Sequence, residues 1–202
     1  MFPGKTEQYK ESIRINADGF CFTLPDGSRR AVIRAPFTAI PYSADFELKE
    51  EEREALFSMV FPSVKDVTIL TEHVQEFGIT ILSGIKKEIE ARLASDFEGA
   101  VVMSHIHHIL TESFEWKGRL ITAIRQDDGI DVIATDNNRI LFLNTLRTSQ
   151  PYEAVYYIIK VWKESGFRSG DACIRLAGLK DTDDGLLRNL RLMTGENSVC
   201  VL

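Results

Sequence analysis

Apolar and polar positions alternate in the N-terminal part of this chain, and Asp-Gly turns interrupt the alternation. Residues 12–34 contain three such runs, which are joined by the turns NADG and PDGS. An Asp-Gly pair between alternating runs is a strong hairpin signal, because glycine accepts a positive φ at little cost. The pattern therefore predicts a three-stranded antiparallel meander. The next segment, PFTAIPYS, is predicted to be a loop because Pro36 and Pro41 interrupt it.

The rest of the first half mixes helical and strand periodicity. Helical spacing of apolar residues predicts helices over 47–60, 83–97 and 104–114. Pro62 ends the first helix, and Ser104 is suited to cap the last one. The apolar stripe of the first helix is predicted to consist of Leu48, Leu56, Met59 and Val60. Strands are predicted over 64–72 and 77–82, and a short apolar segment follows at 100–103.

A second series of alternating runs begins near the middle of the chain. RLITAIR, GIDVIAT and RILFLNTLR predict three more strands, joined by QDDG and DNN. After them we expect a helix over 150–166, a strand over 171–178, a helix over 183–195 and a last strand over 198–202. The inward residues of these two helices are predicted to be Ala154, Val155, Ile158, Ile159 and Trp162, then Leu186, Leu187, Leu190 and Met193.

The two meanders align with one constant offset and no gap. The aligned pairs are Asp18 with Asp128, Gly19 with Gly129, Asp26 with Asp136 and Arg29 with Arg139. An internal repeat indicates two lobes of related architecture. The alternative is that both meanders use the same residues because all hairpin turns favour them. We expect lobes at 1–115 and 116–202, with a boundary near 114–119.

Composition limits the classes of function. The chain of 202 residues has a formal net charge of -6, and it contains no long run of Lys and Arg. Such a chain repels a phosphate backbone, so no nucleic-acid binding is expected. It has neither the apolar core of a signal peptide nor an apolar run that would span a bilayer, so we expect a cytoplasmic protein without direct membrane insertion. Cys21, Cys173 and Cys200 lie singly in apolar runs and are interpreted as buried small hydrophobic residues.

Three stretches resemble a bacterial domain-of-unknown-function family of the actin-like clan. They are SIRINADGFCF near the start, the segment 127–166, and LAG at 176–178. The resemblance covers most of the chain. It implies an α/β fold, namely an actin-like tandem of two ribonuclease H-like half-domains. Each half would contain a three-stranded antiparallel meander with helices and further strands, the first half being abbreviated. It also implies kinship with the actin-like platforms of pilus assembly and type II secretion, which hold a protein partner.

The resemblance further implies a nucleotide site, and its parts can be compared with this chain. An actin-like ATPase has an acidic residue at the end of the first strand, which positions magnesium and water, and a glycine-rich turn that approaches the phosphates. Asn16 stands in place of the acid in the first meander, and Arg125 in the second. The adenosine-side loop, where the family has paired glycines, offers Ala177, Gly178 and the large Leu179. In the turn, Asp18 stands where the first glycine should be, and no hydroxyl follows Gly19. All three parts depart from the ATPase pattern, so we expect no catalytic residues and no cofactor.

A remnant nucleotide site, binding ATP and magnesium, is the main alternative. Its cofactor-binding residues would be Asp18, Gly19, Asp128, Gly129 and Gly178. The simpler interpretation makes the acids turn residues, because Asp tolerates turn geometry and bonds to its own backbone. On that interpretation QDDG is a hairpin turn, with Gly129 at a positive φ. A ribonuclease H-like nuclease is excluded, because two metals need several converging carboxylates and the strand SIRI contains none.

The segment HIHH raises a zinc hypothesis. On a helix His105 and His108 are neighbours, His107 points elsewhere, and Glu112 lies one turn beyond His108. No motif with ligand spacing completes the set, so a solvated or capping histidine cluster is favoured.

Tyr152 and Tyr156 share one face of the helix predicted over 150–166. Exposed aromatic residues anchor protein partners, whereas buried ones would fill the side facing the sheet.

The sequence favours a degenerate, non-catalytic actin-like scaffold that binds a protein. An ATP-binding protein with an unusual phosphate loop and a zinc-binding module using His105 and His108 remain as alternatives. The sequence leaves the oligomeric state open.

Overall fold

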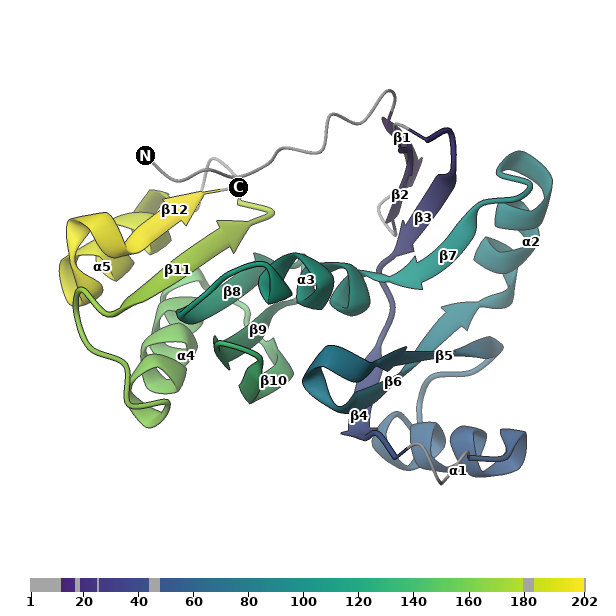
Figure 1. Cartoon of the computed structure of the whole chain (residues 1–202), viewed down its shortest axis with the longest axis horizontal. Coiled ribbons are helices and arrows are strands. Elements are labelled where there is room, and N and C mark those ends of the chain that lie inside the picture. The colour runs from purple at the N-terminus through teal and green to yellow at the C-terminus, as the bar shows by residue number, and fades with distance from the viewer. Residues whose placement is uncertain (1–11, 17–18, 25, 44–47, 180–183, 202) are drawn as a thin grey trace. The chain divides into compact units, whose positions relative to one another are not determined.

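The computed structural model describes residues 12–16, 19–24, 26–43, 48–179 and 184–201. The chain divides into two compact units, residues 1–111 and 112–202 (Figure 1). The division falls inside helix α3 (His105–Phe114). Each unit is an α/β structure built around its own sheets.

The first unit opens with the predicted meander. It consists of β1 (Ser12–Asn16), β2 (Gly19–Thr23) and β3 (Arg29–Ile33), which pair antiparallel in that order. β7 (Val101–Ser104) then joins the free edge of β3 in parallel, giving the order β1-β2-β3-β7. The alternation read from the sequence therefore identified these three strands correctly.

A second sheet of the first unit includes a strand where the sequence predicted a loop. It has the order β4-β6-β5, from β4 (Phe37–Pro41), β5 (Val67–Val74) and β6 (Ile79–Lys86). The 3-10 turn Gln75–Phe77 joins β5 to β6. The loop prediction for PFTAIPYS was wrong, because Pro36 precedes β4 and Pro41 is its last residue. A proline at a strand end interrupts little of the ladder.

The helices of the first unit are α1 (Glu50–Val60), α2 (Lys87–Asp96) and the part of α3 up to Thr111. The predicted stripe of α1 was wrong for Met59, which is 80% exposed, and for Val60, which is 53% exposed. Leu56 is half-buried, and Phe57 is the buried residue of the helix. A β-carbon at Gly84 of β6 would collide with the Phe57 ring, so this glycine makes room for it. α2 starts later than predicted, since residues 83–86 belong to β6.

The second unit follows the predicted order throughout. Its strands are β8 (Arg119–Arg125), β9 (Gly129–Asp136), β10 (Arg139–Arg147), β11 (Ala172–Ala177) and β12 (Val199–Val201). Its helices are α4 (Pro151–Glu164), α5 (Asp184–Thr194) and the 3-10 turn Glu196–Ser198. The sheet order is β10-β9-β8-β11-β12, with β11 parallel to both of its neighbours.

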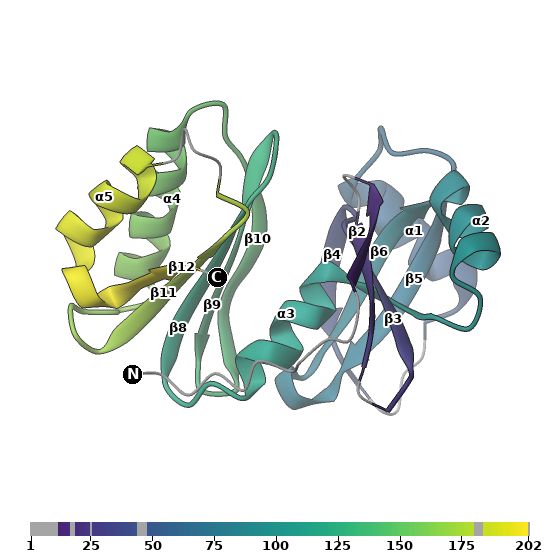
Figure 2. The ribbon, with the colours of Figure 1, turned by 90° about the horizontal axis from the view of Figure 1, so that it is seen from above.

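Helices α4 and α5 cover one face of this sheet (Figure 2). The predicted inward residues of α4 form the core with Leu186 and Leu190 of α5. Met193 was placed wrongly, since it is 65% exposed. The core residues form an apolar layer between the sheet and the two helices.

The two meanders differ in their connection to the rest of the sheet. In the first unit the parallel neighbour, β7, pairs with the last strand of the meander. In the second unit the parallel neighbour, β11, pairs with the first strand, β8. The repeat seen in the sequence thus describes the two meanders and does not extend to the strand order of the units.

Candidate functional site

The backbone hydrogen bonds around the start of β9 define the structural role of QDDG. The Gln126 N–H donates to the Gly129 carbonyl at 2.9 Å, which closes a tight connection between β8 and β9. The carbonyl of Asp128 accepts the N–H of Thr148 at 3.2 Å. The segment is a hairpin turn, as predicted, and its backbone is hydrogen-bonded to the chain beyond β10.

Gly129 is needed for a different reason from the one the sequence suggested. The prediction of a positive φ was wrong, because Gly129 already has strand geometry as the first residue of β9. A β-carbon there would lie 2.7 Å from the carbonyl oxygen of Leu146 in β10. Gly19, the aligned residue of the first repeat, likewise begins β2 and approaches the carbonyl oxygen of Val32. The repeated glycine therefore permits close approach of two strands.

Arg125 lies at the centre of the candidate nucleotide residues of the second unit. Its Nη1 donates to the Gly129 carbonyl at 3.0 Å and also to the Thr148 hydroxyl. Gly178, with a φ of 70°, follows β11 beside β8, and a β-carbon on it would lie 2.6 Å from the Arg125 carbonyl oxygen. Gly129 and Gly178 thus both lie next to Arg125.

The candidates of the first repeat lie in the other unit. Gly19 belongs to β2, and Asp18 lies outside the described residues. Gly19 therefore belongs to a different sheet from the one in which Gly129 begins β9 and Gly178 follows β11.

A buried carboxylate next to this turn was not among the residues predicted from the sequence. Asp131 of β9 is 1% exposed. It accepts a hydrogen bond from the Thr145 hydroxyl at 2.6 Å and another from the side-chain amide of Gln126. An acid inside the apolar run GIDVIAT was the available signal, because a buried acid requires hydrogen-bond partners.

A second acid lies at the start of α4. Glu153 accepts the N–H of Ser149 at 2.6 Å and that of Gln150 at 3.0 Å. These backbone donors lower the pKa of the Glu153 carboxyl, since they favour its charged form. The N-terminus of α4 is therefore capped by the chain's own carboxylate.

The histidines at the start of α3 contact different groups. His105 packs edge-on against Phe37, with ring centroids 5.9 Å apart, and His108 is tilted against Phe22 at 5.8 Å. Over the described part of the chain, no three metal-binding side chains gather into a possible site. Glu112, suggested as a third ligand, is thus not grouped with the two histidines.

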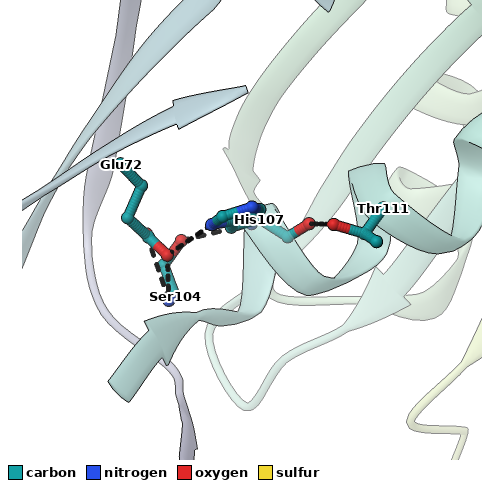
Figure 3. Close-up of polar contacts among 4 residues, drawn as sticks. All are labelled: Glu72, Ser104, His107 and Thr111. Atoms are coloured by element: carbon teal, nitrogen blue, oxygen red, sulfur yellow. Dashed lines mark hydrogen bonds and ion pairs between the residues drawn. The ribbon is translucent and has the colours of Figure 1, made fainter. Parts of the chain in front are cut away.

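His107, which was not among the zinc candidates predicted from the sequence, contacts a buried carboxylate. Its Nδ1 lies 2.7 Å from Oε1 of Glu72, a buried acid in β5. Figure 3 shows this contact. Both Glu72 oxygens also accept the N–H of Ser104, at 3.0 and 3.1 Å. The Ser104 hydroxyl accepts the N–H of His107 at 3.2 Å, which confirms the predicted helix cap. Glu72 shares the parity of buried Val74 along β5, so strand alternation could have placed it inward.

The fold of the chain is that of the actin-like ATPases. A Bacteroides thetaiotaomicron protein described as having an actin-like ATPase fold and unknown function matches 100% of this chain and 94% of its own, with a TM-score of 0.72 and 20% identity. This chain belongs to the family described as "Protein of unknown function (DUF3822)", whose profile matches residues 34–192. The family resemblance read from the sequence is thereby confirmed.

More distant structures match with lower scores. The PilM-PilN type IV pilus biogenesis complex gives a TM-score of 0.44 and 11% identity over 85% of this chain and 68% of that one. The Aquifex aeolicus PPX-GPPA enzyme gives 0.31 and 12% over 81% and 65%. No curated protein matches the sequence significantly. None of the helices in the described segments has the length and apolar character to cross a membrane.

Proposed function

We propose that this chain is a non-catalytic actin-like protein that acts by binding a protein partner. The observation that carries the proposal is Arg125 at the end of β8. A phosphate-transferring site needs a carboxylate there, to hold magnesium and orient water. Arg125 instead presents a cation, which repels magnesium.

The surroundings of Arg125 support a structural role for it. Its guanidinium is held by the Gly129 carbonyl and the Thr148 hydroxyl, so it joins the β8–β9 turn to the end of β10. The nearby acid Asp131 accepts from Gln126 and Thr145 and is buried. An acid that is buried and bonded in this way is poorly placed to coordinate a metal ion from solvent.

Two exposed tyrosines of α4 support the proposal that the chain binds a protein partner. Tyr152 is 67% exposed and Tyr156 is 60% exposed, one helical turn apart. The ring of Tyr156 packs edge-on against Tyr157, with centroids 5.4 Å apart, which restricts its motion. Rigid exposed aromatic side chains bury a large area at low entropic cost when a protein docks.

Nucleotide binding is tested with the purified protein. ATP with magnesium is expected to leave the melting temperature unchanged, because only a ligand of the native state raises it. Phosphate release is expected to stay at background for the wild type and for Asp128→Asn alike. If the wild type hydrolyses ATP and Asp128→Asn abolishes this without loss of stability, QDDG is a phosphate loop and the proposal is wrong.

Partner binding is tested by photo-crosslinking in the cells that naturally make the protein. A photoreactive residue in place of Tyr156 is expected to give adducts of defined mass. The control places the same residue at Asn189, which is exposed on α5. Identical adduct patterns at the two positions would contradict a docking role for α4.

A further inference from the structure

Two cysteines from distant parts of the second unit lie side by side. β11 and β12 pair in parallel, with Arg175 opposite Cys200. This register brings the Sγ atoms of Cys173 and Cys200 to 3.7 Å from each other. Cys173 is buried as predicted, but Cys200 is partly exposed, so the interpretation of all three cysteines as buried was wrong for Cys200.

We propose that Cys173 and Cys200 form a peroxide-reactive thiol pair, in which Cys200 is oxidised first and Cys173 then closes an intramolecular disulfide. The two sulfur atoms would close a gap of 3.7 Å to the length of a disulfide bond, and both strands that carry them are already paired. The different exposure of the two thiols sets the order of reaction. A peroxide from solvent reaches Cys200, and the buried Cys173 reacts with what forms there.

The electrostatic surroundings favour Cys200 as the attacking group. The hydrogen bond between the two sulfur atoms lowers the pKa of Cys200, and the positive charge of Arg175 acts in the same direction, against the effect of burial. The same hydrogen bond, together with burial, raises the pKa of Cys173. Arg175 is positioned over the ring of Trp116, with its guanidinium carbon 5.4 Å from the ring centre. The thiolate is the reactive form, so these effects concentrate reactivity on one sulfur.

The chemistry balances in two steps. The Cys200 thiolate attacks one oxygen of hydrogen peroxide, the O–O bond breaks, and a sulfenic acid and hydroxide result. The hydroxide takes up a proton and becomes water. The sulfur of Cys173 then attacks the sulfenic sulfur, the S–O bond breaks, and the thiol proton leaves with the oxygen as a second water. Two thiols are oxidised by two electrons, and one peroxide is reduced to two waters.

A disulfide between Cys173 and Cys200 would link β12 covalently to β11. β12 spans Val199–Val201, and among the described strands its one pairing partner is β11. A disulfide to β11 closes a loop that contains α5, which limits the unfolded chain and raises the melting temperature of the oxidised protein.

The test treats the reduced wild type with hydrogen peroxide at a small molar excess, blocks the remaining thiols and maps the peptides. We expect a mass loss of about 2 Da in a peptide linking Cys173 to Cys200, one blocked thiol at Cys21, and reversal by dithiothreitol. Cys21→Ser is the matched control and should form the same link. Cys173→Ser should instead leave a sulfenic acid at Cys200 that dimedone traps.

Three outcomes would overturn the proposal. They are three thiols that all remain free after treatment, a link that includes Cys21, and a disulfide between two chains. Because mapping of the wild type alone decides among these results, the conclusion does not depend on the folding of either serine variant.

Discussion

Nδ1 of His107 lies 2.7 Å from a carboxylate oxygen of Glu72, although 35 positions separate the two residues in the chain. The carboxylate also receives the Ser104 N–H, so one buried acid joins β5 to the junction of β7 and α3. This acid satisfies a backbone donor at the helix start, where no carbonyl of the helix itself is available. The pair is therefore a link between elements that the sheets alone do not join directly.

Removal of this acid should weaken the first unit. Glu72→Ala is expected to lower the free energy of unfolding by about 1–3 kcal/mol, because the buried Ser104 N–H and the His107 ring lose their acceptor. Urea unfolding measures the change. Glu76→Ala, at an exposed position just beyond β5, is the control and should change it by less than about 0.5 kcal/mol. Equal effects of the two substitutions would contradict the assigned role of Glu72.

The close approach of β9 and β10 predicts opposite effects for one substitution at two glycines. Gly129→Ala should destabilise by more than about 1 kcal/mol, because the new methyl group would press on the Leu146 carbonyl. Gly185→Ala should stabilise by roughly 0.5 kcal/mol, since it lies in α5 with nothing near its missing β-carbon. Denaturant midpoints compare them. A stable Gly129→Ala variant would show that the strands can separate at no cost.

Zinc should have no part in the stability of the protein. His105 and His108 pack against separate aromatic rings and His107 bonds to Glu72, so the three imidazoles do not converge. Protein purified without an affinity tag should contain substoichiometric zinc, and EDTA should not change its melting temperature. One tightly held zinc per chain would refute this expectation.

The cap of α4 predicts a pH-dependent effect. The N–H groups of Ser149 and Gln150 lower the pKa of Glu153 in the folded protein. Its stabilisation is therefore fully present above the unfolded pKa and is lost as the pH falls through the folded value. Glu153→Gln should lower the urea midpoint near neutral pH, and the difference from the wild type should vanish once the pH has fallen below the pKa of Glu153 in the folded protein.

The other end of α4 provides a control for that experiment. Glu164 is the last residue of the helix and is exposed, and a negative charge there opposes the helix dipole. Glu164→Gln should not lower the midpoint at neutral pH. If the Glu153→Gln deficit were the same at every pH, the effect would come from lost packing and not from the charge.

The sequence by itself determined most of the elements. Hydrophobic periodicity is a property of neighbouring residues, so the meanders and the inward face of α4, including Ala154 and Ile158, could be predicted locally. QDDG could also be predicted locally, because an Asp-Gly pair between two strands is typical of a hairpin turn. The family motifs predicted the actin-like fold, and the match to the Bacteroides structure confirmed it.

Only the tertiary structure decided which strands and side chains meet. The pairing of β4 with β6 turned a proline-flanked segment into a strand, and Phe57 became the anchor of α1 because Gly84 leaves space for its ring. The contacts of Glu72 with His107 and of Cys173 with Cys200 join residues far apart in the chain. Such partners depend on strand order and register, and the energies that select these are summed over the whole core, so no local pattern contains them.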